Sequence, residues 1–330
     1  MEMKVKVLGN HSVPGSGAYE WRPGFVFTDD PTCADYDWLV VYDELPADDR
    51  GTFRDGFEPL ACPREHTILA TWEPISVKRY SRAYTRQFGH LLSNRPPDAE
   101  HHPHYHLGRG YYHWFCGHTR EELARSPEKT REISSVCSAK RMRRTQHRAR
   151  FDLVSALAAA IPGFDWYGKG VRPLERKYEA LDPYRYHVAV ENHIGAHHWT
   201  EKLADAFLCE CLPFYAGDPA IFEVFPKDSL IRIPINDPAK AIRIVKDALA
   251  ANEYARRREA VLEAKRRILE RYNFWDQVIE VIRSAEEQSV IAVDPVRPPR
   301  IYARKALRRR SPLVAMEDGW LHIKLSLGII

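Results

Sequence analysis

The sequence predicts an α/β protein with two doubly wound domains in tandem. Short, continuous apolar runs alternate with segments of helical spacing along most of the chain. This alternation restarts after a polar break at residues 126–129. Strands that alternate with helices are typical of a parallel sheet covered on both faces. A length of 330 residues agrees with two domains of roughly 150 residues each.

The composition is that of a folded protein and excludes several other classes. Hydrophobic residues make up 44% of the chain and charged residues 28%, which excludes a disordered chain. The net charge of +4 is too small to indicate nucleic acid as a partner. No apolar run approaches the roughly 18 residues that cross a bilayer, and Met1–Gly9 lacks the features of a signal peptide. The six cysteines are scattered without metal-finger spacing, so we expect free thiols in a cytoplasmic protein.

The first domain is expected over residues 1–127. Continuous apolar runs predict strands that are buried on both faces. The predicted strands are Val5–Leu8, Trp38–Tyr42, Thr67–Trp72 and Leu91–Ser93, and the predicted helix is Val77–Phe88. A segment rich in proline, histidine and aromatic residues follows at 95–120 and breaks this rhythm. The polar stretch Ser126–Lys129 then predicts the connection between the domains.

The second domain is expected over residues 128–290, where the pattern restarts. Its predicted strands are Ile133–Cys137, Phe164–Gly168, Tyr186–Val190, Leu212–Gly217 and Leu230–Ile233. Its predicted helices are Thr145–Ala160, Glu201–Cys211, Pro238–Ala250, Glu253–Tyr272 and Trp275–Gln288. Thr200 precedes the second of these helices as a favourable N-cap residue.

A basic segment is expected at the end of the chain, over residues 291–330. Arg300–Arg310 contains six basic residues and no acidic one. Such a segment can contact an anionic inner leaflet at the membrane periphery, and a solvated tail is the equal alternative. The alternation in Trp320–Leu325 predicts an edge strand or a docking segment.

The stretch from Tyr186 to Pro219 carries the strongest functional pattern. A strand leads to Glu191-Asn192, and a helix begins after Thr200 with Glu201-Lys202. Ligands of open α/β sheets lie beyond the carboxyl ends of the strands. A helix N-terminus there presents N–H groups and a positive dipole end to a diphosphate, and Lys202 adds a positive charge. Glu201 offers an acceptor for ribose hydroxyls, although an ordinary N-cap with a first-turn carboxylate is the alternative interpretation.

This block resembles the signature of glycosyltransferase family 10, the α-1,3/1,4-fucosyltransferases. The resemblance rests on Glu191-Asn192, eight intervening residues, Thr200-Glu201-Lys202, an apolar helix, and Pro213 followed by Gly217. It implies the GT-B architecture, in which two Rossmann-like domains face each other across a cleft. It also implies inverting transfer of fucose from GDP-fucose, with GDP in the C-terminal domain and the acceptor largely in the N-terminal one.

The resemblance also implies roles for individual residues. Arg150 matches an arginine that binds the donor phosphates, with the neighbouring Arg148 as its rival. Glu73, in Trp72-Glu73-Pro74, resembles the family's general base, whereas a capping role for the following helix is the alternative. The residues implied in donor binding are Arg150, Glu191, Asn192, His198, Thr200, Glu201 and Lys202, and those on the acceptor side are Trp72, Tyr112 and Trp114.

The chain also departs from the family pattern. His193 stands where the family has Ser or Thr, and His198-Trp199 replaces its usual pair before Thr-Glu-Lys. The histidines at 101, 102, 104 and 106 are candidate metal ligands, but no carboxylate motif completes a site. The resemblance also implies a fold that needs no intrinsic metal ion. We therefore expect a GDP-fucose-dependent enzyme without cofactor or nucleic-acid partner, acting on a glycan or lipid-linked glycan of a surface polysaccharide such as lipopolysaccharide. The alternatives are another GDP-sugar as donor, or a catalytically degenerate binder of glycan or nucleotide.

Overall fold

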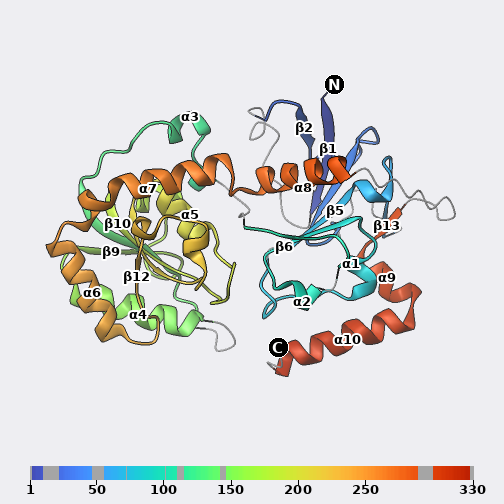
Figure 1. Cartoon of the computed structure of the whole chain (residues 1–330). Coiled ribbons are helices and arrows are strands. Elements are labelled where there is room, and N and C mark those ends of the chain that lie inside the picture. The colour runs from blue at the N-terminus through green and yellow to red at the C-terminus, as the bar shows by residue number, and fades with distance from the viewer. Residues whose placement is uncertain are drawn as a thin grey trace. The chain divides into compact units, whose positions relative to one another are not determined.

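The computed structural model describes residues 2–9, 22–46, 56–71, 73–100, 102–109, 115–141, 146–288 and 300–327. The chain divides into two compact units, which Figure 1 shows in ribbon form: unit 1 comprises residues 1–108 and 275–330, and unit 2 comprises residues 109–274. The sequence instead predicts boundaries after residues 127 and 290. Trp275 explains part of the difference, because its ring packs edge-on against Phe27, with centroids 5.0 Å apart. The helix that contains Trp275 therefore packs in unit 1, with the first sheet.

Unit 1 contains a six-stranded sheet in the order β2-β1-β3-β5-β6-β7. Every neighbouring pair in it is parallel. Its strands are β1 (Met3–Gly9), β2 (Phe25–Thr28), β3 (Trp38–Tyr42), β5 (Thr67–Thr71), β6 (His90–Ser93) and β7 (Tyr105–Leu107). All residues of β3, β5 and β6 are buried, as their continuous apolar runs predict. β4 (Phe57–Pro59) and β13 (Arg300–Tyr302) form a separate antiparallel pair.

The helices of unit 1 correct two expectations. They are α1 (Arg82–Thr85), α2 (Pro97–Glu100), α8 (Phe274–Gln288, whose first residue is in unit 2), α9 (Arg304–Arg310) and α10 (Pro312–Leu327). The predicted helix at 77–88 shrinks to α1, because Tyr80 and Tyr84 are placed by tertiary hydrogen bonds: both hydroxyls donate to Asp43, at 2.5 Å and 3.3 Å. The predicted edge strand at 320–325 is wrong, since this segment belongs to α10.

Two local features explain why α10 forms. Val314 donates its N–H to the Ser311 hydroxyl at 3.4 Å, and Pro312 occupies the first helical position. Over the longer window, large apolar residues recur three and four positions apart, which is helical spacing. The short alternation at 320–325 is part of that longer pattern.

Unit 2 contains a five-stranded parallel sheet in the order β12-β11-β10-β8-β9. Its strands are β8 (Arg131–Val136), β9 (Phe164–Tyr167), β10 (Tyr184–Val190), β11 (Leu212–Ala216) and β12 (Ile231–Arg232). Its helices are α3 (Arg120–Leu123), α4 (His147–Ala160), α5 (Glu201–Leu208), α6 (Pro238–Ala250) and α7 (Glu253–Glu270). In Figure 1, α4 and α6 lie below the sheet, and α5 and α7 lie above it. The predicted Rossmann-like fold of this half is thus confirmed.

Candidate functional site

The candidate site of unit 2 lies where the direction of the sheet's connections reverses. The chain runs from β8 through α4 to β9 on one side, and from β10 through α5 to β11 on the other. β8 and β10 are neighbours, so their carboxyl ends meet between these two connections. In open α/β sheets, ligands bind in the crevice at such a switch point.

Arg150 joins the two strand ends at this point. It is the fourth residue of α4, and 7% of its surface is exposed. One guanidinium nitrogen donates to the side-chain oxygen of Asn192, just beyond β10. The other donates to the main-chain oxygen of Val136, at the end of β8, over 3.2 Å. The rival Arg148 is exposed and pairs with Asp152 at 3.8 Å, as a solvated helix face does.

Two helix N-termini converge on Asn192. The main-chain N–H of Gln146, the residue before α4, donates to the main-chain oxygen of Asn192 at 3.0 Å. The second helix, α5, starts at Glu201, and its N-cap Thr200 is tied to Glu191, the neighbour of Asn192. The positive dipole ends and unpaired N–H groups of both helices favour an anion at this edge of the sheet.

Glu191 holds the start of α5 in place. Its carboxylate is completely buried and accepts hydrogen bonds from the Thr200 main-chain N–H at 2.9 Å and from the Thr200 hydroxyl at 2.7 Å. The Lys202 ammonium lies 3.5 Å from the same carboxylate and 3.0 Å from that of Glu201. These contacts make Glu191 a positioning residue for Thr200 and Lys202, whereas the sequence places it among the donor ligands.

Opposite charges alternate through the first turns of α5. Burial opposes the ionised form of Glu201, but Lys202 and Lys177 outweigh it and hold the pKa of this carboxyl far below its ordinary value. Burial likewise opposes the charge on Lys202, but Glu201 and Glu191 outweigh it and raise the pKa of the ammonium. Lys177 also forms an ion pair with the buried Asp205. Lys202 therefore carries a positive charge that is fixed in position.

His147 is a member of the site that the sequence does not single out. Burial lowers the pKa of its imidazole, and the positive charges of Arg150, Lys140 and Lys202 lower it further. Lys140, Arg150 and Lys202 are thus close enough to His147 to act on its charge, and we call these four residues the basic cluster. In the sequence, His147 stands among the many basic residues of 140–150, and no motif singles it out. Only its position as the first residue of α4 distinguishes it.

A glycine permits the close packing of this edge. A Cβ atom on Gly217, directly after β11, would lie 2.2 Å from the Tyr215 hydroxyl and 2.7 Å from Cγ of Glu191. The Tyr215 hydroxyl accepts the main-chain N–H of Asp218 at 3.0 Å, so it has little freedom to move. This packing explains the glycine that closes the Pro213–Gly217 pattern.

The histidine-rich loop between β10 and α5 is fixed by internal contacts. The rings of His193 and His198 meet edge to face with centroids 5.3 Å apart, and His198 is 7% exposed. His197 has a φ of 63°, and its N–H donates to the carboxylate of Asp218 at 3.0 Å. The contact with His193 therefore holds the His198 ring in place, and the sequence places this ring in the donor site.

Glu73, the candidate base, belongs to unit 1. It comes two residues after β5, and its main-chain oxygen accepts two hydrogen bonds from the Arg95 guanidinium, at 2.9 Å and 2.8 Å. Arg95 is buried and paired with Glu100 at 2.7 Å. The alternative role of Glu73 as a helix cap is not supported, because residues 74–78 form a turn and α1 begins only at Arg82. Trp72, Tyr112 and Trp114 lie outside the described residues.

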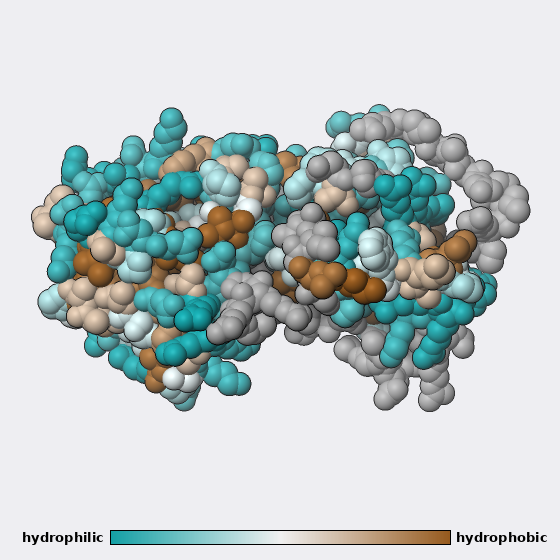
Figure 2. Space-filling view, turned by 90° about the horizontal axis from the view of Figure 1, so that it is seen from below, coloured by the Kyte–Doolittle hydropathy of each residue, from teal (hydrophilic) through white to brown (hydrophobic). Residues whose placement is uncertain are grey.

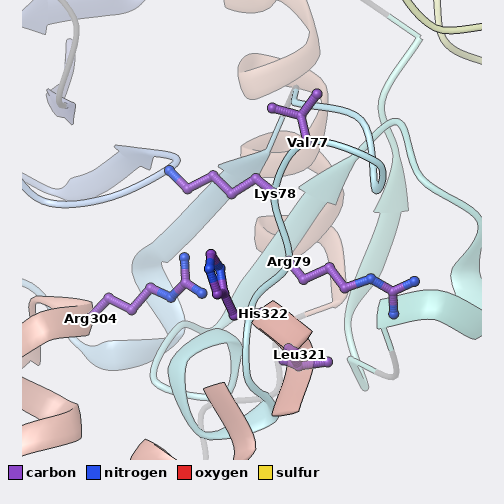
Figure 3. A pocket seen from close by; sticks show the side chains of 6 residues that line it. All are labelled: Val77, Lys78, Arg79, Arg304, Leu321 and His322. Carbon is purple, nitrogen blue, oxygen red and sulfur yellow. The ribbon is translucent and has the colours of Figure 1, made fainter. Parts of the chain in front are cut away.

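The turn after Glu73 forms one wall of a pocket in unit 1. The pocket is lined by Val77, Lys78, Arg79, Arg304, Leu321 and His322, and Arg304 and His322 lie side by side in it (Figure 3). Lys78 pairs with Glu44 at 3.3 Å, and Arg304 pairs with Asp318 at 3.1 Å. Much of the positive charge in the pocket is thus already balanced by these carboxylates.

One cluster in the described part of the chain has metal-ligating side chains in range of one another: the ligand atoms of His118, Asp182 and Cys209 lie within 4.8 Å. His118 contacts Asp182 at 2.9 Å and stacks on Tyr178 with centroids 4.4 Å apart. In unit 1, the rings of His90, His102, His104 and His106 pack together, and the nitrogens of His90 and His106 approach to 3.1 Å. His101 lies outside the described residues. Neither cluster lies among the residues of the candidate site.

Comparison with known proteins identifies the fold. No family model and no curated protein sequence matches this chain. The structure is similar to a crystal structure of an α1,3-fucosyltransferase, with a TM-score of 0.54 and 16% identity over 89% of this chain and 92% of that one. Crystal structures of α1,3-fucosyltransferase with GDP-fucose and with GDP give TM-scores of 0.52 and 0.51 at 15% identity, over 89% and 88% of this chain and 93% and 92% of the other. The similarity spans both units and confirms the predicted α/β fold with two Rossmann-like units, as in GT-B proteins.

Proposed function

We propose that this protein is a glycosyltransferase that takes a sugar from a nucleotide-sugar donor, and specifically L-fucose from GDP-fucose. The observation that carries the proposal is the meeting of Arg150, Asn192, Lys202 and two helix N-termini at the switch point of the unit 2 sheet. Arg150 and the two helix N-termini present N–H donors to a diphosphate, and Lys202, held between Glu191 and Glu201, adds a fixed ammonium group. A protein of similar fold with GDP-fucose in its crystal structure supports the choice of donor.

The basic cluster would act on the leaving group. As the bond between the sugar and the diphosphate breaks, negative charge grows on GDP. Arg150 and Lys202 are fixed by their contacts, so they stabilise that charge without rearranging during the reaction. Asn192 and Glu201 would hold the nucleotide sugar by hydrogen bonds.

Glu73 would act on the acceptor. Its carboxylate takes the proton from an acceptor hydroxyl as that oxygen attacks the anomeric carbon, and the pair of electrons in the breaking bond leaves with GDP. Attack from the side opposite GDP inverts the configuration of the sugar carbon. A glycan hydroxyl is the acceptor group in this proposal, and no cofactor or metal ion takes part.

Two alternatives differ in specific ways. Another GDP-sugar is favoured by the His193–His198 ring pair, which replaces the residues that the fucosyltransferase pattern has at these positions. A degenerate binder would keep the basic cluster but transfer no sugar. The retained Glu73, Arg150 and Lys202 favour an enzyme over such a binder.

The test is thermal unfolding of the full chain with GDP, UDP, CDP, ADP, GDP-fucose and GDP-mannose. A ligand at a hundred times its dissociation constant stabilises the folded state by about 2.7 kcal/mol. We expect GDP and GDP-fucose to raise the midpoint and the other nucleotides to leave it unchanged. A shift with GDP-mannose equal to that with GDP-fucose would favour the first alternative. No shift with any guanine nucleotide would contradict a GDP-sugar donor.

A panel of glycan acceptors then separates an enzyme from a binder. Transfer is followed by release of GDP and by NMR of the new glycosidic bond, whose anomeric configuration should be opposite to that of the donor. A stable donor complex that hydrolyses or transfers nothing with any acceptor would favour the degenerate binder.

A further inference from the structure

The outward face of α10 is an apolar stripe that the described residues of unit 1 leave exposed. Its five members recur at helical spacing and are largely exposed: Leu313 (77%), Met316 (71%), Trp320 (57%), Ile323 (49%) and Leu327 (67%). Figure 2 shows hydrophobic side chains, drawn brown, in a row over α10. Large apolar side chains that stand exposed together mark an interaction surface, whereas single ones are ordinary.

The opposite face of the helix anchors α10 to unit 1. Val314 and Asp318 are 8% and 3% exposed. The Asp318 carboxylate accepts from Arg304 at 3.1 Å and from Arg308, both on α9. The apolar stripe therefore cannot turn inward without breaking these ion pairs.

The charges beside the stripe are almost all positive. Residues 300–327 contain seven Lys and Arg and two acidic residues, Glu317 and Asp318. Neither acid is exposed: Asp318 is buried, and Glu317 accepts the main-chain N–H of Arg82 at 2.9 Å. The side chains of α9 and α10 that are described as exposed are thus apolar, neutral or basic, and the basic ones include Lys305, Arg309 and Arg310.

We propose that α9 and α10 dock on an anionic lipid bilayer, with the apolar stripe of α10 at the level of the acyl chains and the basic residues of α9 among the headgroups. A helix with an apolar face and Lys and Arg beside it lies in the plane of a membrane surface. Trp320 suits that interface because its ring is amphipathic. The 16 residues of α10 form a rod of about 24 Å, shorter than the hydrocarbon core of a bilayer. No helix in the described ranges is long and apolar enough to cross a membrane.

The charges of α9 and α10 favour an anionic bilayer over a second copy of the chain as the partner of the apolar stripe. Two copies that paired through the stripe would bring two basic α9 segments to one complex, without exposed acidic residues on either α9 or α10 to balance them. Oligomer helices that pair through such stripes use complementary charges at the flanking positions. Here one flank carries Glu317 and Lys324 and the other carries Gly319, and the Glu317 carboxylate is already bound to the main-chain N–H of Arg82.

The test is flotation of the full chain with vesicles of phosphatidylcholine alone and of phosphatidylcholine with phosphatidylglycerol. We expect the chain to float with the anionic vesicles and to be released by high salt. Met316→Ser should lower the partition coefficient about tenfold, because it removes one apolar side chain from the contact. Arg309→Gln should lower it about fivefold on anionic vesicles, in line with about 1 kcal/mol per basic residue, and change nothing on neutral ones.

Val171→Ser is the matched control. Val171 is 41% exposed and lies in unit 2, away from the stripe, so its replacement should leave the partition unchanged. Brominated lipids give a second readout, because bromine quenches the fluorescence of a tryptophan that it contacts. We expect these lipids to quench the fluorescence of the unaltered chain and to quench that of the Trp320→Phe variant less. Both readouts are independent of donor binding, so they hold or fail separately from the proposed transferase activity.

Three results would overturn the proposal. The first is no flotation with anionic vesicles. The second is flotation that Met316→Ser and Val171→Ser reduce equally. The third is a dimer in analytical ultracentrifugation that Met316→Ser dissociates while vesicle binding is absent, which would assign the stripe to a second copy of the chain.

Discussion

Arg150 donates to the side-chain oxygen of Asn192, a residue 42 positions further along the chain. Because the same guanidinium also donates to Val136, it connects α4 with the ends of both β8 and β10. A guanidinium has five N–H donors, and the bonds to Asn192 and Val136 use two of them. Arg150 is therefore fixed by the protein and still able to contact phosphate oxygens.

Arg150→Lys should lower kcat by about a hundredfold, as the loss of a transition-state donor does. Lysine keeps the charge but loses the forked geometry that reaches Asn192 and Val136 together. The measurement is steady-state transfer from the donor, with the unfolding midpoint recorded for the same variant.

Arg148→Lys is the control for this prediction. Arg148 lies two residues away on the exposed face of α4 and pairs only loosely with Asp152, so its replacement should leave kcat within about twofold. Equal losses in the two variants would mean that Arg150 has no special role.

The strands and the charged residues of the site could be predicted from sequence because their signals are local. The apolar runs at Trp38–Tyr42 and Tyr186–Val190 predict buried strands, and Thr200 marks the start of α5. The bond between Arg150 and Asn192 could not be predicted, because it depends on how α4 packs beside a strand that comes later in the chain.

The failures of prediction have the same physical origin. The spacing of residues 77–88 predicts a long helix, but only a short part of it is helical. The buried hydroxyls of Tyr80 and Tyr84 need hydrogen-bond partners, and Asp43 supplies them. Helix α8 packs in unit 1 because the ring of Trp275 contacts the ring of Phe27. Both outcomes are set by contacts between distant segments, which periodicity within a window does not contain.

Glu191→Gln should destabilise unit 2 and weaken donor binding. The buried carboxylate accepts from both the N–H and the hydroxyl of Thr200 and lies beside Lys202. An amide offers one oxygen in place of two and no charge, so we expect a loss of about 2 kcal/mol in the free energy of unfolding. Denaturant unfolding measures it, and Glu223→Gln, at a side chain that is 52% exposed, should change it little.

Gly217→Ala should lower the unfolding midpoint and the affinity for donor together. The new methyl group would overlap the Tyr215 hydroxyl and the Glu191 side chain, which are both held by other hydrogen bonds. Gly319→Ala is the matched control, because a Cβ atom there has nothing within 4 Å, and alanine in a helix should stabilise by up to about 1 kcal/mol. Two similar destabilisations would contradict the packing explanation.

The stability of unit 2 should fall on acidification through His187. Burial lowers the pKa of this imidazole to about 3, with a smaller contribution from Lys177 and Lys129. The unfolded chain, with a histidine pKa of about 6.5, therefore binds more protons than the folded one between these values. Stability then rises with pH across this window, by up to about 1.4 kcal/mol per pH unit from this residue.

His187→Gln tests this contribution, because glutamine can still hydrogen-bond with Ser134, which contacts the His187 ring nitrogen at 2.8 Å. Urea unfolding at a series of pH values from 4 to 7 should give a shallower pH dependence for the variant. An unchanged slope would mean that His187 is not the buried proton acceptor. His90 in unit 1, with a pKa lowered to about 4 chiefly by burial, should add a separate slope of the same sign.

Glu73→Gln should abolish most transfer without weakening the donor complex. Glutamine cannot take a proton from the acceptor, and loss of a general base costs about a hundredfold to ten-thousandfold in rate. Arg95 holds the main-chain oxygen of residue 73, so the turn should keep its shape in the variant. The measurement is kcat for transfer beside the midpoint shift that GDP-fucose produces. Because Glu73 and the basic cluster lie in different units, a variant that lost donor binding as well as transfer would contradict the division of roles between them. Glu65→Gln, on the short helical turn Arg64–His66 of the same unit, should leave both quantities unchanged.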